Sequence, residues 1–232
     1  MDYYSKEEYI QETKKTMNRF GNNSEEEWSN VEHALAYLNK ADNIPHRTEG
    51  EAVLLDYVPI GAGRILDLGT GDGRLIRLLK IDRPKMEAVA LDTSPVMLRA
   101  ARKQFENDSS IKVIKHDLNF PLPKSLGCFD VVVSSLAIHH LPHERKRSLY
   151  REVYDMLKPS GIFCNLDNIA SPSMKHHIRF LHAIGFTPET ESKSDKLLSM
   201  ETQLGWLREI GFVDVDCYWK WLEMALLMGY KP

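Results

Sequence analysis

Between residues 64 and 167, short continuous apolar runs alternate with segments that repeat apolar residues at helical spacing. The runs read RILDL, EAVALD, IKVIKHD, FDVVVSS and GIFCNLD, and the helical segments between them include GRLIRLLK and PVMLRAARKQF. Runs without polar alternation are typical of parallel strands whose two faces are both covered by helices. The alternation of strand and crossover helix predicts a doubly wound α/β sheet.

The C-terminal third adds a different pattern. METQLGWLREIGF predicts a last helix, and VDVDCYWKW and MALLMGYK predict a hairpin-like pair of strands. We therefore expect a Rossmann-like, seven-stranded sheet that is mostly parallel and has an antiparallel last strand. Before that helix, residues of about 168–196 contain one helical segment, IRFLHAIGF, within polar sequence. We expect this insertion to cover an acceptor, and its KSDK run to be a solvated loop.

The N-terminal part has a helical pattern over residues 5–20 and another over residues 24–41. Ser24 is a suitable cap for the second helix, and three glutamates occupy its first turn. The predicted organisation is a helical lid over residues 1–60 and a ligand-binding domain over residues 61–232.

Composition and charge narrow the partners. A net charge of −3 offers no basic field for nucleic acid. We also expect no membrane span, because no run approaches the roughly 18 apolar residues required, and the charged N-terminus is unlike a secretory signal. The three cysteines are far apart in apolar surroundings, which favours buried thiols over disulfides and a cytoplasmic protein.

The most informative stretch is ILDLGTGDGR, a glycine-rich turn after the first apolar run. Such a turn lets backbone approach a ligand without a Cβ in the way. Asp67 and Asp72 flank the glycines, and the spacing is G-x-G-x-G, not the G-x-G-x-x-G of dinucleotide sites. Two carboxylates disfavour a pyrophosphate by several kcal/mol if poorly solvated. They suit S-adenosylmethionine, which carries a sulfonium and an ammonium but no phosphate.

The next two strands support a nucleoside ligand. EAVALD ends in Asp92, about 20 residues after the glycines, where a carboxylate accepts hydrogen bonds from ribose hydroxyls. The third strand is followed by Asp117 and Leu118, which suit the amine and the ring of an adenine. Met97, in the helix after the second strand, is a candidate for the other face of that ring.

Taken in order, DLGTGDG, Asp92, His116-Asp117-Leu118, FDVVVSSLAIHHL and LKPSGIF resemble the successive motifs of class I S-adenosylmethionine-dependent methyltransferases. The resemblance is close over residues 61–167. It implies that the cofactor is S-adenosylmethionine and the product S-adenosylhomocysteine. The cofactor-binding set that follows is Asp67, Gly69, Thr70, Gly71, Asp92, Thr93, Met97, Asp117, Leu118, Ser134, Ser135 and, from the lid, Arg47.

Histidines supply the candidates for catalysis. In IHHLP, His139 and His143 are four residues apart and are expected on one helical face, but no His-Glu-x-x-His pattern follows. We therefore predict no metal, and packing or positioning as the main role of this run. The best general-base candidates are His140 and His46.

The sequence thus predicts methyl transfer from S-adenosylmethionine to a small-molecule acceptor. There is no nucleic-acid-reading module, and SSLA stands where the family's base-methylating members have an Asn/Asp-Pro-Pro-Tyr type motif. The acceptor atom, O, N or C, stays open, and a monomer or homodimer is expected. The alternative is a non-catalytic S-adenosylmethionine-binding regulatory or partner subunit. A nicotinamide oxidoreductase is disfavoured by Asp72 and the glycine spacing.

Overall fold

The computed structural model describes residues 32, 35, 43–192 and 194–232. The helices expected over residues 5–20 and 24–41 lie outside the described residues. The strands are β1 (Arg64–Leu68), β2 (Glu87–Asp92), β3 (Ile111–Lys115), β4 (Phe129–Ser135), β5 (Leu157–Asn168), β6 (Val213–Trp221) and β7 (Met224–Tyr230). The helices are α3 (Arg47–Tyr57), α4 (Arg74–Asp82), α5 (Pro95–Gln104), α6 (His143–Met156), α7 (Met174–Ala183) and α8 (Met200–Ile210), with 3-10 turns η2 (Lys124–Leu126) and η3 (Ile138–His140).

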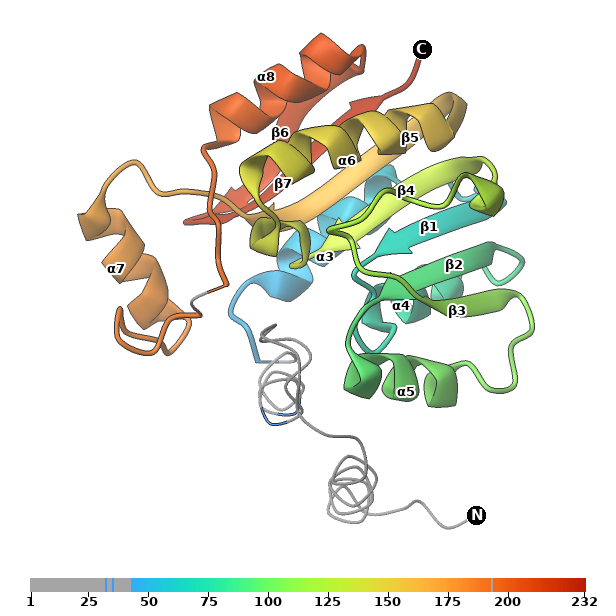
Figure 1. The fold of residues 1–232 in the computed structure, drawn as a ribbon, viewed down its shortest axis with the longest axis horizontal. Helices are drawn as coiled ribbons and strands as arrows, with labels where there is room; N and C mark the ends of the chain where they lie inside the picture. Colours follow the sequence, from blue (N-terminus) through green and yellow to red (C-terminus); the bar gives the residue numbers. More distant parts are fainter. Residues whose placement is uncertain (1–31, 33–34, 36–42, 193) are drawn as a thin grey trace.

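All seven strands form one sheet, in the order β3-β2-β1-β4-β5-β7-β6 (Figure 1). The first five strands in this order run parallel, and β7 runs antiparallel to both of its neighbours. The expected sheet is confirmed. In the sheet, β1 lies between β2 and β4. The chain adds β2 and β3 on one side of β1 and then β4 and β5 on the other, so the strand order reverses at β1. That is the place where open α/β sheets bind ligands, beyond the carboxyl ends of the strands.

Both faces of the sheet are buried, which explains the continuous apolar runs. Leu66 and Leu68 of β1 belong to a core shared with α6 and α8, whereas Ile65 belongs to a second core shared with α3 and α4. The first core includes Tyr150 and Phe163, whose rings meet edge to face at 5.4 Å. Helix α3 comes from the segment assigned to the lid, but it packs on β5, β6 and β7 as one of the covering helices.

Several local expectations need correction. Strand β5 begins at Leu157, not at Gly161, because the exposed residues 158–160 extend a strand that the Pro-Ser-Gly sequence made look like a loop. The buried-thiol prediction is right only for Cys164; Cys128 is exposed and Cys217 partly so, and all three are free thiols. Helix α6 begins at His143, so the four-residue spacing from His139 spans a turn, not one helical face. Among the described residues, no helix has the length and apolar character needed to cross a membrane.

One buried arginine joins the ends of α3 and α4. Arg83 is 3% exposed, and its guanidinium donates hydrogen bonds to the backbone carbonyls of Leu55, Val58 and Pro59. The last carbonyls of a helix have no partners within the helix, so these bonds supply what α3 lacks. Since Arg47 is on the same helix, Arg83 helps to fix the position of a candidate site residue.

Replacing Arg83 with alanine is expected to lower the free energy of unfolding by about 2–4 kcal/mol, because charged hydrogen bonds are lost and buried carbonyls lose their donors. Urea denaturation measures this loss. The matched control is Arg102→Ala on the exposed face of α5, expected to change stability by less than about 0.5 kcal/mol. Equal losses in both variants would contradict the role of Arg83.

Candidate functional site

The glycine turn between β1 and α4 is built from backbone that other residues adopt with strain. Gly69, Gly71 and Gly73 have φ angles of 72°, 59° and 89°, the left-handed region that favours glycine. The amides of Gly69 and Thr70 donate to the Leu91 carbonyl at 2.9 and 2.8 Å, which ties the turn to β2. A Cβ on Gly69 would lie 2.2 Å from the Cβ of Ala137. The glycine turn and the turn after β4 are therefore in direct contact.

Asp92, the last residue of β2, is fixed across this turn. One carboxylate oxygen accepts the Gly71 amide at 2.8 Å, and the other accepts the Ser94 amide at 2.8 Å. Burial raises the pKa of Asp92 to about 6, although these hydrogen bonds oppose the rise. Each carboxylate oxygen has more than one acceptor direction, so Asp92 can accept further bonds from a ligand without moving.

Asp67 is the most deeply buried acid of the turn. It is 1% exposed, and its Oδ2 accepts no hydrogen bond from the described residues. Burial raises its pKa to about 7, and the negative charge of Asp92 adds to the rise, while the Thr70 side chain and the Arg47 guanidinium lower it. A buried carboxylate oxygen without a hydrogen bond is costly, so Oδ2 of Asp67 can receive a donor or a cation.

Two arginines meet beside the same turn. Glu51 on α3 is 1% exposed and accepts Arg47 Nε at 2.9 Å and Arg74 Nη2 at 2.9 Å. Arg74 is the first residue of α4, directly after the glycines. Two guanidiniums and one carboxylate leave a net positive charge near Asp67. The structure thus brings Arg47 to the glycine turn, as the sequence analysis expected.

The other predicted cofactor residues fall into two groups. Asp117 and Thr93 are partly exposed just beyond the strand ends, whereas Met97 and Leu118 are 2% and 8% exposed in the interior beside them. Ser134 is fully buried, and its hydroxyl donates to the Leu68 carbonyl at 2.8 Å. Its hydroxyl therefore ties β4 to β1. The list is completed by Ser135, whose buried Oγ has no hydrogen-bond partner among the described residues.

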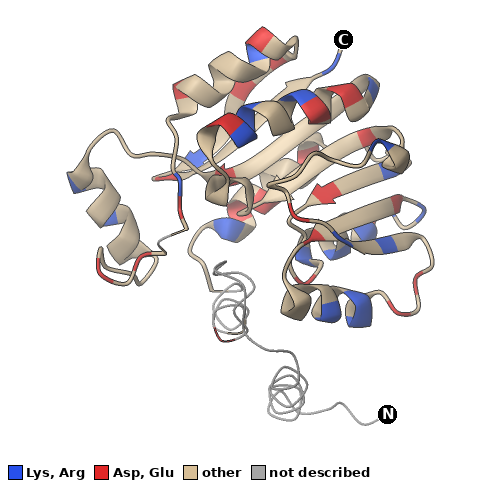
Figure 2. Cartoon of the chain, in the orientation of Figure 1, with Lys and Arg blue, Asp and Glu red and all other residues tan. Residues whose placement is uncertain are grey.

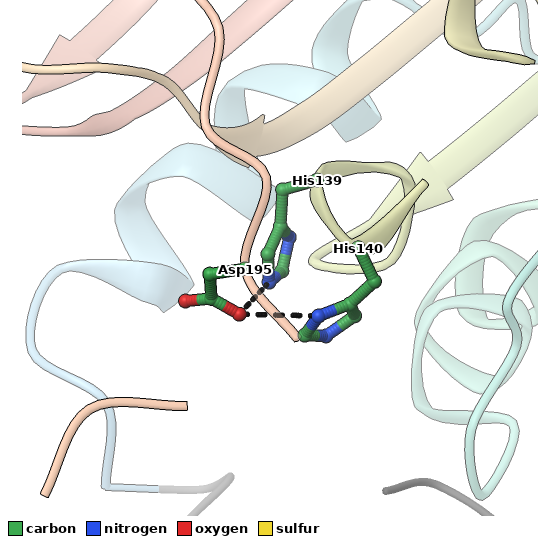
Figure 3. A group of neighbouring side chains, drawn as sticks. All are labelled: His139, His140 and Asp195. Carbon is green, nitrogen blue, oxygen red and sulfur yellow. Dashed lines mark ion pairs between the residues drawn. The ribbon is translucent and has the colours of Figure 1, made fainter. Parts of the chain in front are cut away.

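The histidine turn after β4 carries the densest cluster of titratable groups (Figure 3). His139 Nδ1 lies 2.5 Å from Asp167 Oδ1 at the end of β5. On its other side, His139 Nε2 lies 3.6 Å from Asp195 Oδ1, and His140 Nδ1 lies 3.1 Å from the same oxygen. Asp167 raises the pKa of His139 against the effect of burial, whereas burial lowers the pKa of His140 to about 4. His140, the expected base, is held neutral.

Asp195 was missed by the sequence analysis. The prediction that KSDK is a solvated loop is wrong for Ser194 and Asp195, which are partly buried against the histidine turn, whereas the Lys196 side chain is exposed. The Lys196 amide donates to the His139 carbonyl at 3.0 Å, and buried Lys146 donates to the Lys196 carbonyl. Ser194 Oγ lies 2.9 Å from His140 Nδ1. The segment has no periodicity, so only the polar character of its residues was visible in the sequence.

His46, the second base candidate, lies in another setting. It is exposed, stacks on the Trp221 ring at 4.4 Å and hydrogen-bonds to Glu49.

Helix α7, in the insertion before α8, is held by His177, whose two ring nitrogens lie 2.9 Å from Glu223 and 3.1 Å from Glu191. None of the contacts of His46 or His177 involves the turn of His139 and His140.

Comparisons with known proteins identify the family of this chain. Residues 65–161 match the family described as a methyltransferase domain. An uncharacterized methyltransferase of Mycobacterium tuberculosis is 31% identical over 146 residues, which are 62% of this chain and 71% of that protein. The chain belongs to the class I S-adenosylmethionine-dependent methyltransferases. Its cofactor is S-adenosylmethionine, and it belongs to a family of enzymes.

Two further similarities extend this result. The chain is 27% identical over 131 residues to an ornithine lipid N-methyltransferase of Singulisphaera acidiphila, covering 54% of this chain and 68% of the relative. The structure of an O-methyltransferase family protein from Burkholderia thailandensis aligns with a TM-score of 0.69 at 17% identity, covering 97% of this chain and 71% of that one. At 17% identity, this structural match shows that the methyltransferase and the Burkholderia protein share a fold.

The contact between the two turns gives a direct test. Gly69→Ala is expected to lower the free energy of unfolding by about 2–4 kcal/mol, because a left-handed alanine is strained and its Cβ overlaps Ala137. Gly71 also has a positive φ, but a Cβ there meets nothing within 4 Å. Gly71→Ala is therefore the control and is expected to cost only about 1–2 kcal/mol. Chemical denaturation without ligand measures both, and equal losses would contradict the close contact.

Proposed function

We propose that this methyltransferase transfers the methyl group of S-adenosylmethionine to a small molecule whose reacting atom lies at the histidine turn. The observation that carries the proposal is the pairing of Asp92 with the glycine turn, because a carboxylate fixed by the Gly71 and Ser94 amides is preorganised to accept ribose hydroxyls. Direct contact between the glycine turn and the turn after β4 supports a position of the methyl donor beside His139 and His140.

The cofactor would bind along the carboxyl ends of β1, β2 and β3. In this arrangement Gly69, Thr70 and Gly71 receive the methionine part. Asp67 faces its cationic groups, and Arg47 faces its carboxylate. Further along the strand ends, Asp92 and Thr93 bind the ribose, and Met97, Asp117 and Leu118 surround the adenine. Ser135, with its unpartnered buried hydroxyl, is better suited than Ser134 to meet a ligand.

The acceptor side has an apolar wall. Leu136 after β4, Phe180 of α7 and Met224 of β7 form a buried cluster against which Trp221 packs. The polar groups of the histidine turn lie a few residues along the chain from this wall. This combination favours an acceptor with an apolar part and one reacting polar atom. Holding that atom in line with the methyl group and the sulfur supplies most of the acceleration.

The net charge of −3 supports a small acceptor over nucleic acid. Figure 2 shows Lys and Arg next to Asp and Glu on α6 and α8, whereas α5 carries Lys and Arg alone. By its name, one relative acts on an ornithine lipid, which is not a nucleic acid. A cytoplasmic monomer or homodimer completes the proposal.

The first test addresses the ribose site. Asp92→Ala is expected to weaken the binding of S-adenosylhomocysteine by about tenfold or more, since hydrogen bonds to a charged group are lost. Isothermal calorimetry measures the affinity, with Asp155→Asn on the exposed face of α6 as the control. Unchanged affinity in Asp92→Ala would show that the ribose lies elsewhere.

A second test uses the burial of Asp67. With a pKa of about 7, Asp67 is about nine-tenths protonated at pH 6 and mostly ionised at pH 8. Only the ionised form attracts the cofactor's ammonium, so binding favours loss of this proton. The affinity for S-adenosylhomocysteine is therefore expected to rise as pH increases through 7, by up to about tenfold between pH 6 and pH 8. Asp67→Asn should abolish most of this rise, and an equal rise in the variant would assign it to another group.

Turnover separates the enzyme from the alternative of a cofactor-binding partner subunit. Incubation with S-adenosylmethionine and a panel of small hydroxyl, amine and carboxylate compounds is expected to release S-adenosylhomocysteine with at least one class. Tight S-adenosylmethionine binding without turnover on any of them would favour the partner subunit.

A further inference from the structure

The three side chains in Figure 3 converge on one point from two parts of the chain. His139 and His140 come from the turn after β4, and Asp195 comes from the insertion before α8. One ligand-type atom from each, His139 Nε2, His140 Nδ1 and Asp195 Oδ1, lies within 4.8 Å of the other two. The sequence analysis predicted no metal because no His-Glu-x-x-His pattern follows these histidines; the folded chain brings Asp195 to His140 from 55 residues away.

The positions of the ring protons decide whether His139 Nε2, His140 Nδ1 and Asp195 Oδ1 can share a cation. Asp167 Oδ1 accepts a hydrogen bond from His139 Nδ1 at 2.5 Å. A neutral His139 therefore directs the lone pair of its Nε2 toward Asp195 Oδ1, 3.6 Å away. Asp195 Oδ1 is buried, and His140 Nδ1 lies 3.1 Å from it. When the proton of neutral His140 is on Nε2, lone pairs of all three atoms converge at distances that a bound cation can bridge.

The charge count leads to the same conclusion. Asp167 and Asp195 carry two negative charges, and the buried ammonium of Lys146 acts on both, while the ammonium of Lys196 lies at the exposed rim of the cluster. With neutral imidazoles, the buried groups keep one negative charge, which is costly unless it is neutralised. Either a proton on His139 or a bound metal ion supplies the missing positive charge.

The distances suit a metal ion. Two ligands about 2.0–2.1 Å from a tetrahedral Zn²⁺ are separated by about 3.3–3.4 Å, and the observed separations from Asp195 Oδ1, 3.1 and 3.6 Å, bracket that value. Asp167 completes the usual surroundings, because a metal-binding histidine ordinarily donates its other ring N–H to a carboxylate. Ser194, now 2.9 Å from His140 Nδ1, would turn its hydroxyl away from that nitrogen on metal binding.

We propose that His139 Nε2, His140 Nδ1 and Asp195 Oδ1 bind a divalent transition-metal ion, with Zn²⁺ as the best match, and that its open position receives the oxygen of a hydroxyl acceptor. Two imidazoles and one carboxylate favour such an ion over Mg²⁺, which prefers oxygen ligands. Three protein ligands leave a fourth position for substrate, the pattern of catalytic zinc sites.

The acceptor half of this proposal rests on the proposed function. A hydroxyl bound to the ion releases its proton to water at lower pH than a free hydroxyl does. Its oxygen lone pair then attacks the methyl carbon of S-adenosylmethionine. The carbon–sulfur bond breaks and its electron pair goes to sulfur, which gives the methyl ether and S-adenosylhomocysteine. The substrate class is therefore an alcohol or phenol.

Calorimetric titration of chelator-treated protein with Zn²⁺ tests the site. We expect one ion per chain with micromolar or tighter affinity, unaffected by millimolar Mg²⁺. Asp195→Asn and His140→Ala should each weaken binding by at least tenfold, and Asp167→Asn by about tenfold through His139. The matched control, Asp155→Asn, should bind Zn²⁺ normally. Absence of binding, or binding unchanged by the two ligand variants, would mean that a proton alone occupies the cluster.

X-ray absorption at the zinc edge needs no variant and so does not depend on how the variants fold. It should find nitrogen and oxygen neighbours at about 2.0–2.1 Å, including two imidazoles, whereas a sulfur neighbour at about 2.3 Å would overturn the assignment. Binding of S-adenosylhomocysteine to metal-free protein separates the two proposals. If S-adenosylhomocysteine binds but no zinc site is found, only the metal proposal is overturned. If the unaltered protein does not bind S-adenosylhomocysteine, the proposed function is overturned.

Discussion

The structure depends on the close approach of two turns at the carboxyl end of the sheet. Strands β1 and β4 are neighbours, and the backbone that leaves each of them meets the other where the strand order reverses. Gly69 makes this possible, because any side chain at that position would overlap Ala137. One missing Cβ therefore joins two chemically different surfaces, the acidic glycine turn and the histidine turn. A reaction between a bound donor and an acceptor needs this kind of juxtaposition.

Burial of charge is the second constraint, and the fold tolerates it through pairing. Glu51 is inaccessible but holds two guanidiniums, and Asp92 is held by two backbone amides. Asp67 and Asp195 differ, because each has a buried oxygen without a hydrogen bond from the described residues. Buried oxygens without hydrogen bonds destabilise a protein that has no ligand bound. A sequence selected for stability alone would not keep them. Asp67 lies beside the glycine turn and Asp195 beside the histidine turn, so the cost falls where the proposed ligands would bind.

The sequence was sufficient for the strands of the sheet and their type, because these follow from local pattern. Continuous apolar runs indicated buried parallel strands, and the polar VDVDCYWKW beside apolar MALLMGYK indicated an edge hairpin. The start of β5 was missed because residues 158–160 are exposed and carry turn-forming residues, although pairing with β4 and β7 keeps the rest of the strand in the sheet. Tertiary pairing outweighs local propensity at such a position.

The candidate site was predictable where it follows strand ends and not where it depends on a loop. Asp92 and the glycines sit at fixed offsets from apolar runs, so fold geometry alone brings them together. The pairing of His139 with Asp167 requires knowing that β4 and β5 are neighbours, which the order of the motifs implies but does not state. Asp195 follows no strand and no helical repeat. The sequence around a polar loop residue does not show whether its side chain faces water or a buried imidazole. What distinguishes it is burial of Oδ1 between two ring nitrogens, a long-range property that only the folded chain possesses.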